Sequence, residues 1–323
     1  MELQGPPETE PPVRYARTLL PGQCAQLHVL DLETGADRVL VVSTDHLFEA
    51  PNWHPDGRWI VVNADGVLHR VDATDPTGLE LIPMDGVPEL NNDHLISPDG
   101  RWHYVSANDW HIYRAPWEGG QAERVTANKD PARVFRHFLH GISPDGRTLA
   151  YVGTETLDGD EWGTRALWLL HMDTGEERLL GEGYSPADGP DFAADGRTVY
   201  FNSEVASTRE GHAQLFRHDL ADGTVQQLTD DDRVNWFPHP SPDGRWLAYL
   251  SFPPGTIGHP ADLPVELRLL ELSTGRRTDL VALFGGQGTI NVPSWSPDSR
   301  SLAFVAYPVS DASATGEAVE EGS

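Results

Sequence analysis

Short runs in which apolar and polar side chains alternate recur along the whole chain, and they predict β-strands. Five of them follow directly on a turn-forming sequence: Trp59–Val62, Thr148–Val152, Thr198–Phe201, Trp246–Leu250 and Ser301–Val305. A second set of strand-like runs comes later in each segment, as at Trp110–Arg114, Leu167–Leu170 and Gln214–Arg217. The pattern is typical of an all-β protein built from a repeated unit.

The turn between the strands has the sequence Ser-Pro-Asp-Gly or a close variant. The copies are His54–Gly57, Ser97–Gly100, Ser143–Gly146, Ala194–Gly196, Ser241–Gly244 and Ser296–Ser299. Proline presets φ for the second turn position, and glycine suits the left-handed position that follows the aspartate. Successive turn aspartates are 43, 46, 50, 48 and 55 residues apart, which is enough for four short strands, as in a propeller blade.

The two ends of the chain each supply half of such a unit. Gln26–Leu32 and Arg38–Val42 read as a third and a fourth strand before any turn sequence has occurred, whereas Pro293–Tyr307 reads as a first hairpin with no third strand after it. We therefore expect the ends to complete one another and close a ring, which removes free sheet edges. The alternative, an open solenoid, would leave both halves unpaired. The sequence predicts one six-bladed β-propeller over residues 25–307, with four antiparallel strands per blade, a flexible segment 1–24 and a disordered acidic tail 308–323.

These repeats resemble the PD40, or WD40-like, repeats of the TolB-like propellers, over roughly residues 25–307. The resemblance implies the fold more than the activity, because TolB binds protein partners and other such propellers precede serine peptidase domains. Oligogalacturonate lyases are more distant, with seven blades and a metal held by His and Gln. We expect neither the export signal nor the extra N-terminal domain of TolB, and no Gly-x-Ser-x-Gly sequence is found after the propeller. A Tol role and a peptidase are therefore disfavoured.

Charge and composition narrow the classes of partner. The formal net charge is −27, from 50 acidic and 23 basic residues, so nucleic acid and anionic membrane are not expected as partners. Cys24 is the only cysteine, which excludes an intrachain disulfide. No basic start with an apolar core and no apolar run near 18 residues is found. We expect a cytoplasmic protein.

The longest predicted loops share one face of the propeller. In a propeller the first strand of each blade lines the channel, and the connections between second and third strands lie on the face where first strands begin. In this chain those connections and entry loops are long and irregular: Glu155–Arg165, Glu204–His212, Pro253–Pro264 and Phe284–Asn291. Because binding residues concentrate in such loops, we expect the site on this face.

Imidazole and carboxylate groups recur just before the turns. Three residues before the turn serine or its substitute stand His94, His140 and Asp191, and His239 is one residue out of register. Pseudo-symmetry would bring these four side chains to the axis, where they could bind a divalent metal (Mn²⁺, Zn²⁺, Fe²⁺ or Ca²⁺). His94, His140 and His239 could equally act as catalytic acid or base groups. In the alternative reading, ring histidines only satisfy backbone carbonyls between blades.

Other polar side chains of this face are candidates for ligand binding. They are Glu49, Asp93, Asp191, Asn235, Trp236, His259, Gln287 and Asn291, and a carboxylate could be met by Arg136, Arg165 or Arg209. The sequence thus suggests a propeller that binds a small polar ligand such as a saccharide, with metal-assisted lyase chemistry if it is an enzyme. The alternative is a non-catalytic protein-interaction scaffold like TolB.

Overall fold

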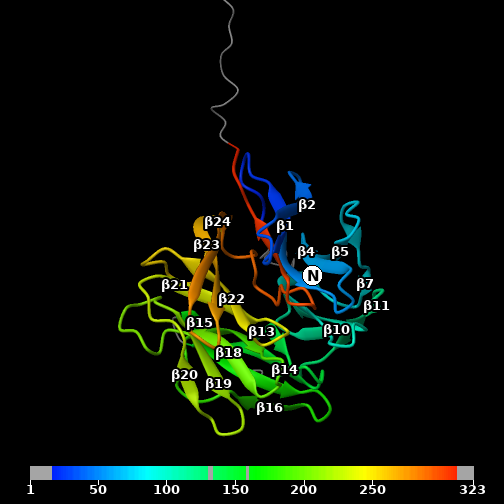
Figure 1. Cartoon of the computed structure of the whole chain (residues 1–323). Coiled ribbons are helices and arrows are strands. Elements are labelled where there is room, and N and C mark those ends of the chain that lie inside the picture. The colour runs from blue at the N-terminus through cyan, green and yellow to red at the C-terminus, as the bar shows by residue number, and fades with distance from the viewer. Residues whose placement is uncertain (1–16, 130–133, 158–159, 311–323) are drawn as a thin grey trace, which may run out of the picture.

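Six antiparallel sheets are arranged around a common axis, as the repeats predict (Figure 1). The computed structural model describes residues 17–129, 134–157 and 160–310. Within these ranges the chain forms strands, turns and loops. These residues contain no helix that is long and apolar enough to cross a membrane. The predicted all-β six-bladed propeller is confirmed.

Five of the six sheets contain four strands each, which follow one another in the sequence and in the sheet. The strands are β3 (Phe48–Trp53), β4 (Trp59–Ala64), β5 (Val67–Asp72) and β6 (Glu80–Leu81) in blade 1; β8 (Leu90–Ile96), β9 (Trp102–Ala107), β10 (Ile112–Pro116) and β12 (Glu123–Arg124) in blade 2; β13 (Phe135–Ile142), β14 (Thr148–Leu157), β15 (Asp160–His171) and β16 (Glu176–Leu179) in blade 3; β17 (Ala187–Phe192), β18 (Thr198–Ser203), β19 (Gln214–Asp219) and β20 (Val225–Gln227) in blade 4; and β21 (Val234–Pro240), β22 (Trp246–Phe252), β23 (Leu263–Glu271) and β24 (Arg277–Gly285) in blade 5. The short strands β7 (Met84–Asp85) and β11 (Gly120–Gln121) pair in parallel between blades 1 and 2.

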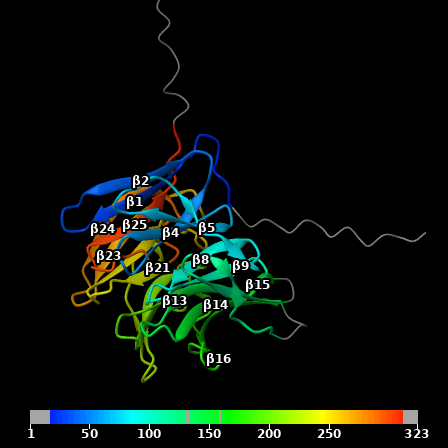
Figure 2. The ribbon, with the colours of Figure 1, turned by 90° about the vertical axis from the view of Figure 1, so that its right-hand side faces the viewer.

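Blade 6 is built from both ends of the chain (Figure 2). Its sheet has the order β2 (Asp37–Ser43), β1 (Ala25–Asp31), β25 (Ser301–Ala306), so the N-terminal strands close the ring against the C-terminal one. The predicted first strand of this blade is reduced to an isolated bridge between Trp295 and Leu302. Pro293, which has no N–H to donate, precedes this bridge.

The closure extends slightly beyond the predicted boundaries. Gln23 forms a bridge with Val309, and the Ser310 amide donates to the Gly22 carbonyl at 2.9 Å. Residues 1–16 of the predicted flexible segment and residues 311–323 of the predicted acidic tail lie outside the described residues.

The four turns that begin with serine are fixed by the same hydrogen bonds. The Ser97 hydroxyl donates to Asp99 Oδ1 at 2.6 Å, and the same carboxylate oxygen accepts from the Arg101 amide at 3.1 Å. These bonds lower the pKa of Asp99 to about 2. Gly100 takes a φ of 71°, whereas Ser299 occupies the equivalent left-handed position in the last turn at 62°. The sequence motif is therefore a structural device that joins the first two strands of a blade.

Substitution of Ser241 by alanine tests the stabilising role of the turn hydroxyl. This hydroxyl donates to Asp243 Oδ1 at 2.6 Å and accepts from the Trp246 amide at 3.0 Å, and Ser241 is buried. We expect the free energy of unfolding, measured with urea, to fall by about 1–2 kcal/mol, because buried groups are left unpaired. Ser273→Ala, in an exposed turn, is the control and should change it by less than about 0.5 kcal/mol. Equal effects of the two substitutions would contradict this role.

Neighbouring blades are held together by apolar clusters and by side-chain bonds to the next backbone. One cluster joins Phe304 of blade 6 to Leu250 and Leu267 of blade 5. Asn52 of blade 1 donates to the Pro293 carbonyl at 2.7 Å and accepts from the Ile96 amide at 2.9 Å, so it links three blades. This packing fixes the inner strands, whose first residues surround the channel mouth.

Candidate functional site

A cavity of about 380 Å³ lies at the channel mouth, on the face opposite the Ser-Pro-Asp-Gly turns. Its wall is formed by the first residues of the inner strands, by parts of second and third strands and by the loops beside them. Amide side chains and aromatic rings make up much of it: Asn91, Asn92, Asn108, Gln287, Asn291, Trp110, Phe138 and Phe237. Charged side chains of both signs complete the wall.

An irregularity in the pairing of each inner strand aims its side chains at the cavity. In all five four-stranded blades the register shifts where the first strand pairs with the second, as between Glu49 and Asn52 in blade 1 and between Asp188 and Asp191 in blade 4. Ala50, Gly189 and Phe237 lie within three of these shifts and have left-handed φ values of 57°, 58° and 55°. Such bulges turn neighbouring side chains to a different face.

One position in each repeat lies seven residues before the turn aspartate, and five of these six side chains line the cavity. They are Glu49, Asn92, Phe138, Asp188 and Asn291; in blade 5 the equivalent residue, Trp236, is replaced in the wall by Phe237. This periodicity is the sequence signal that marks the site. His94 and His140 were selected because they lie three residues before the serine. In most blades that position lies beyond the bulge, where side chains point away from the cavity.

His140 and Asp188 form a buried ion pair in the cavity wall. His140 Nε2 lies 3.1 Å from Asp188 Oδ1, and its Nδ1 lies 3.2 Å from the Asn291 carbonyl oxygen. Burial by itself would lower the pKa of His140, but the charges of Asp93 and Asp188 together raise it to about 9. Burial likewise disfavours the Asp188 anion, yet the hydrogen bond and charge of His140 lower the pKa of this carboxyl. Both groups are therefore charged at neutral pH.

Two further acids of the wall have raised pKa values. Burial, with the charges of Asp188 and Glu49, raises the pKa of Asp93 to about 7 in spite of the nearby His140 cation. Burial also raises the pKa of Glu49, although Arg17 Nη1 donates to Glu49 Oε1 at 2.7 Å. Asp93 is thus the carboxyl of this cavity that exchanges a proton near pH 7.

Arg17 ties the start of the described chain to the cavity. Its guanidinium also donates to the Gln287 carbonyl at 2.6 Å and lies over the Tyr307 ring, 4.7 Å from the centroid. Gly288 is needed beside it, because a Cβ there would lie 2.4 Å from the Tyr307 hydroxyl oxygen and 2.5 Å from Glu49 Oε1, at a φ of 89°. The sequence gives no signal for this arginine, which falls in the segment predicted to be flexible.

Six of the predicted site residues line the cavity: Glu49, Asp93, His140, His259, Gln287 and Asn291. His259 Nδ1 is hydrogen-bonded to the Gln287 side-chain oxygen, and burial lowers the pKa of the imidazole. The Asn291 side chain accepts from the Gly288 amide at 2.7 Å, so it shapes the loop as well as the wall. The prediction did not include Asp188, although the residue lies at the repeated cavity position.

The other predicted histidines lie between blades. His94 is fully buried, with Nδ1 3.1 Å from the Asn92 carbonyl oxygen and Nε2 3.4 Å from that of Val61, and burial lowers its pKa to about 4. His239 contacts Asp191 Oδ2 at 3.0 Å and the Ile290 carbonyl oxygen at 2.7 Å.

The register of the repeats explains why these residues separate. The count from the serine was wrong for Asp191, because Asp191 and His239 each stand four residues before the turn aspartate, whereas His94 and His140 stand five before it. Asp191 and His239 thus occupy a different position of the repeat and form a contact between blades 4 and 5. None of His94, Asp191 and His239 lines the cavity.

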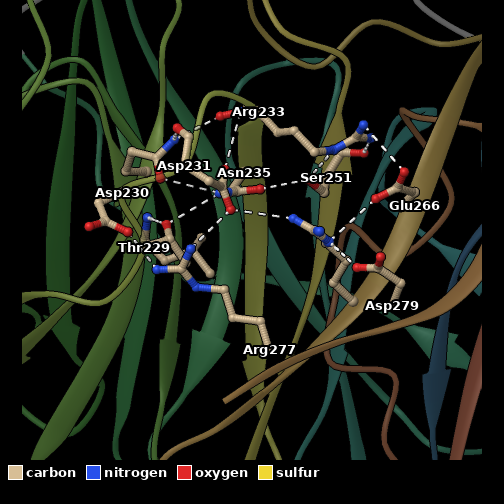
Figure 3. A network of polar contacts seen from close by, with 12 residues as sticks. Thr229, Asp230, Asp231, Arg233, Asn235, Ser251, Glu266, Arg277 and Asp279 are labelled. Atoms are coloured by element: carbon tan, nitrogen blue, oxygen red, sulfur yellow. Dashed lines mark hydrogen bonds and ion pairs between the residues drawn. The ribbon is translucent and has the colours of Figure 1, made fainter. Parts of the chain in front are cut away.

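Asn235 and Trp236 also serve the packing of blades 4 and 5. Asn235 lies in a polar network, where its amide nitrogen donates to Asp231 Oδ1 at 3.1 Å and its oxygen accepts from the Ser251 hydroxyl at 2.7 Å (Figure 3). Arg233 and Arg277 add ion pairs at the edge of this network, to Glu266 and Asp230 (Figure 3). Trp236 is 3% exposed and its ring lies 4.4 Å from that of His259. Neither Asn235 nor Trp236 reaches the cavity wall.

The predicted metal ligands do not gather in one place. Within residues 17–129, 134–157 and 160–310, no group of three or more His, Cys, Asp or Glu side chains is placed to hold a metal ion. His140 is paired with Asp188, and the nitrogens of His94 face carbonyl oxygens. Of the four residues proposed as ligands only Asp191 and His239 contact each other, at 3.0 Å.

The fold and the cavity define a six-bladed propeller with a ligand-sized hollow at one end of its channel. No family model matches the sequence. An uncharacterised protein of Agrobacterium fabrum is 36% identical over 287 residues, which are 88% of this chain and 92% of that protein. A solved structure from Agrobacterium tumefaciens, described as a TolB candidate, is 35% identical, covers 88% of this chain and 99% of its own, and superimposes with a TM-score of 0.79. The chain belongs to the TolB-like β-propeller family.

More distant structures share the fold alone. An oligogalacturonate lyase in complex with manganese is 13% identical, with a TM-score of 0.54 over 81% of this chain and 74% of the lyase.

Proposed function

We propose that this chain binds a small polar ligand, such as a saccharide, in the cavity at the channel mouth. The observation that carries the proposal is a set of buried polar atoms in the wall that have no hydrogen-bond partner among the described residues: Asn108 Oδ1, Thr154 Oγ1 and Arg165 Nε. Unpaired buried polar atoms are rare in proteins and destabilising, so a bound molecule that pairs with them accounts for their presence.

The size and the lining of the cavity support the same proposal. A volume of about 380 Å³ falls within the range of small-molecule sites, roughly 300–1,000 Å³. Asn91 and Asn92 offer donors and acceptors for hydroxyl groups, and the rings of Trp110, Phe138 and Phe237 offer flat apolar faces. Sugars present hydroxyls and apolar ring faces together, which suits this wall.

Proton-transfer chemistry is a second candidate, and it is favoured by the contrast between Asp93 and His140. With a pKa of about 9, His140 holds its proton at neutral pH and would act as an acid. Asp93, with a pKa of about 7, is the group suited to accept a proton. From the sequence alone the histidines could be acid or base and Asp93 was only a ligand-binding candidate, so this assignment of roles is new. The manganese of the distant lyase supports a metal only by analogy, because no three of the described His, Cys, Asp or Glu side chains are placed to hold one.

A protein-interaction surface is the alternative, and exposed apolar side chains favour it. Val67 begins β5 and Val134, Val205 and Ile257 lie in loops, and these four side chains are 43–59% exposed. They are scattered among different blades, which is common on protein surfaces. The cavity and its unpaired atoms therefore carry more weight than these residues.

The proposal is tested by filling the cavity. Asn92 lines it, so Asn92→Trp should occupy part of its volume, while the control Asn92→Ala leaves it open. A panel of neutral monosaccharides, polyols and hydroxy acids would be screened by saturation-transfer NMR, with affinities measured by titration. We expect at least one compound to bind the wild type and Asn92→Ala, and to bind Asn92→Trp at least about tenfold more weakly. No binding by any compound, or equal binding by the tryptophan variant, would contradict a small-ligand site.

A further inference from the structure

Thr154 and Arg165 are placed side by side on the cavity wall. The two residues are directly paired in the antiparallel ladder of β14 and β15 in blade 3, and both line the cavity. Directly opposite residues of such a ladder project to the same face, with their Cβ atoms about 5 Å apart. A hydroxyl and a guanidinium therefore face the same part of the cavity.

Both side chains have unused hydrogen-bonding capacity. Thr154 is 2% exposed, yet its hydroxyl has no partner in the described part of the chain. Arg165 Nε is buried without a partner, and no hydrogen bond or ion pair joins this guanidinium to another described residue. An unpaired arginine in such a wall is costly unless something enters the cavity to meet it.

The other charges of the wall are already compensated. Arg17 is bonded to Glu49 at 2.7 Å, and His140 to Asp188 at 3.1 Å. Asp93 is only partly ionised at neutral pH, because its pKa is raised to about 7. Arg165 is therefore the one full positive charge lining the cavity that the described residues leave without a counter-ion. The net charge of −27 repels anions from most of the protein surface. The positive charge of Arg165 would attract an anion into the cavity.

We propose that the ligand carries a carboxylate, and that Arg165 and Thr154 form the subsite that binds it. The inference rests on the proposed small-ligand function and specifies its substrate class. The guanidinium offers two parallel N–H donors to the two carboxylate oxygens, and the threonine hydroxyl donates a third hydrogen bond. A singly charged carboxylate matches one uncompensated cation, whereas a phosphate dianion beside Asp188 and Glu49 would need a second cation.

The test compares acids with their amides, which keep the shape but lose the charge. The probes are lactate with lactamide and mandelate with mandelamide, titrated by NMR against the wild type, Arg165→Gln, Thr154→Val and Arg147→Gln. Arg147 is an exposed arginine of the same blade, paired with Asp173 at the opposite face, and serves as the matched control. We expect each acid to bind the wild type roughly 10- to 100-fold more tightly than its amide. Arg165→Gln should abolish this preference, Thr154→Val should reduce it several-fold, and Arg147→Gln should preserve it.

Different results would overturn different proposals. If acids and amides bind the wild type equally, and Asn92→Trp weakens both, the cavity is a ligand site but the carboxylate subsite is wrong. A preference for acids that survives in Arg165→Gln also overturns the subsite. If no acid or amide binds and the saccharide panel is equally silent, the small-ligand function fails and this inference fails with it.

Discussion

Replacement of Asp188 by alanine is expected to lower the free energy of unfolding by roughly 3 kcal/mol at pH 7. The change removes the carboxylate 3.1 Å from His140 Nε2 and leaves a buried imidazolium with one partner fewer. Removal of one member of a buried ion pair typically costs about 3–5 kcal/mol. The lower end applies because Asp93 still attracts the cation. Urea unfolding followed by tryptophan fluorescence would measure it.

The matched control is Asp173→Ala. Asp173 is paired with Arg147 at 3.3 Å, but both side chains are more than half exposed, so this ion pair should contribute less than about 0.5 kcal/mol. Similar losses in the two variants would show that the buried pair has no special stabilising role. If Asp188→Ala does not fold, Asp188→Asn keeps an oxygen acceptor for His140 Nε2 and should give an intermediate loss.

Substitution of His140 by glutamine is expected to flatten the pH dependence of stability between pH 7.5 and 9. The pKa of His140 is raised in the folded protein from 6.5 to about 9, so the folded state holds a proton that the unfolded state has lost in this range. The stabilisation is complete below pH 6.5 and disappears as the pH rises through 9. At 1.36 kcal/mol per pKa unit the full stabilisation is about 3 kcal/mol, and the wild type should lose about half of it between pH 7.5 and 9.

In the wild type, Asp93 contributes little to the slope in this window. Its pKa is raised from 3.8 to about 7, so its own contribution also falls with rising pH, but chiefly below pH 7. His46→Gln, at an exposed histidine, should keep the slope of the wild type. Parallel curves for the wild type and His140→Gln between pH 7.5 and 9 would contradict a raised pKa for this imidazole.

The fold could be predicted from the sequence because its determinants are local. Each turn is specified by three or four adjacent residues, such as Ser97, Asp99 and Gly100, whose mutual hydrogen bonds form without help from other blades. The closure of the ring followed from counting the half-blades at the two ends. The weak first strand of blade 6 was not foreseen, although Pro293 marks the place where its ladder fails.

The site was predicted only in part because side-chain direction depends on the bulges. A shift of one residue in the pairing of a strand sends its side chains to the other face, so Asp191 enters the contact between blades while Asp188 enters the cavity. The spacing of seven residues before the turn aspartate would have identified Asp188. Arg17 could not have been found this way, since its contacts are made across more than 240 residues of sequence separation to Gln287 and Asp262.

The shared blade also sets the order in which the protein can mature during synthesis. A growing chain can form blades 1 to 5 as they leave the ribosome, but β1 and β2 have no inner neighbour until Ser301–Ala306 has been made. Until then the nascent protein exposes one open sheet edge on each side of the gap. The cavity is therefore complete only after Gln287 and Asn291, which follow blade 5 in the chain, have been synthesised.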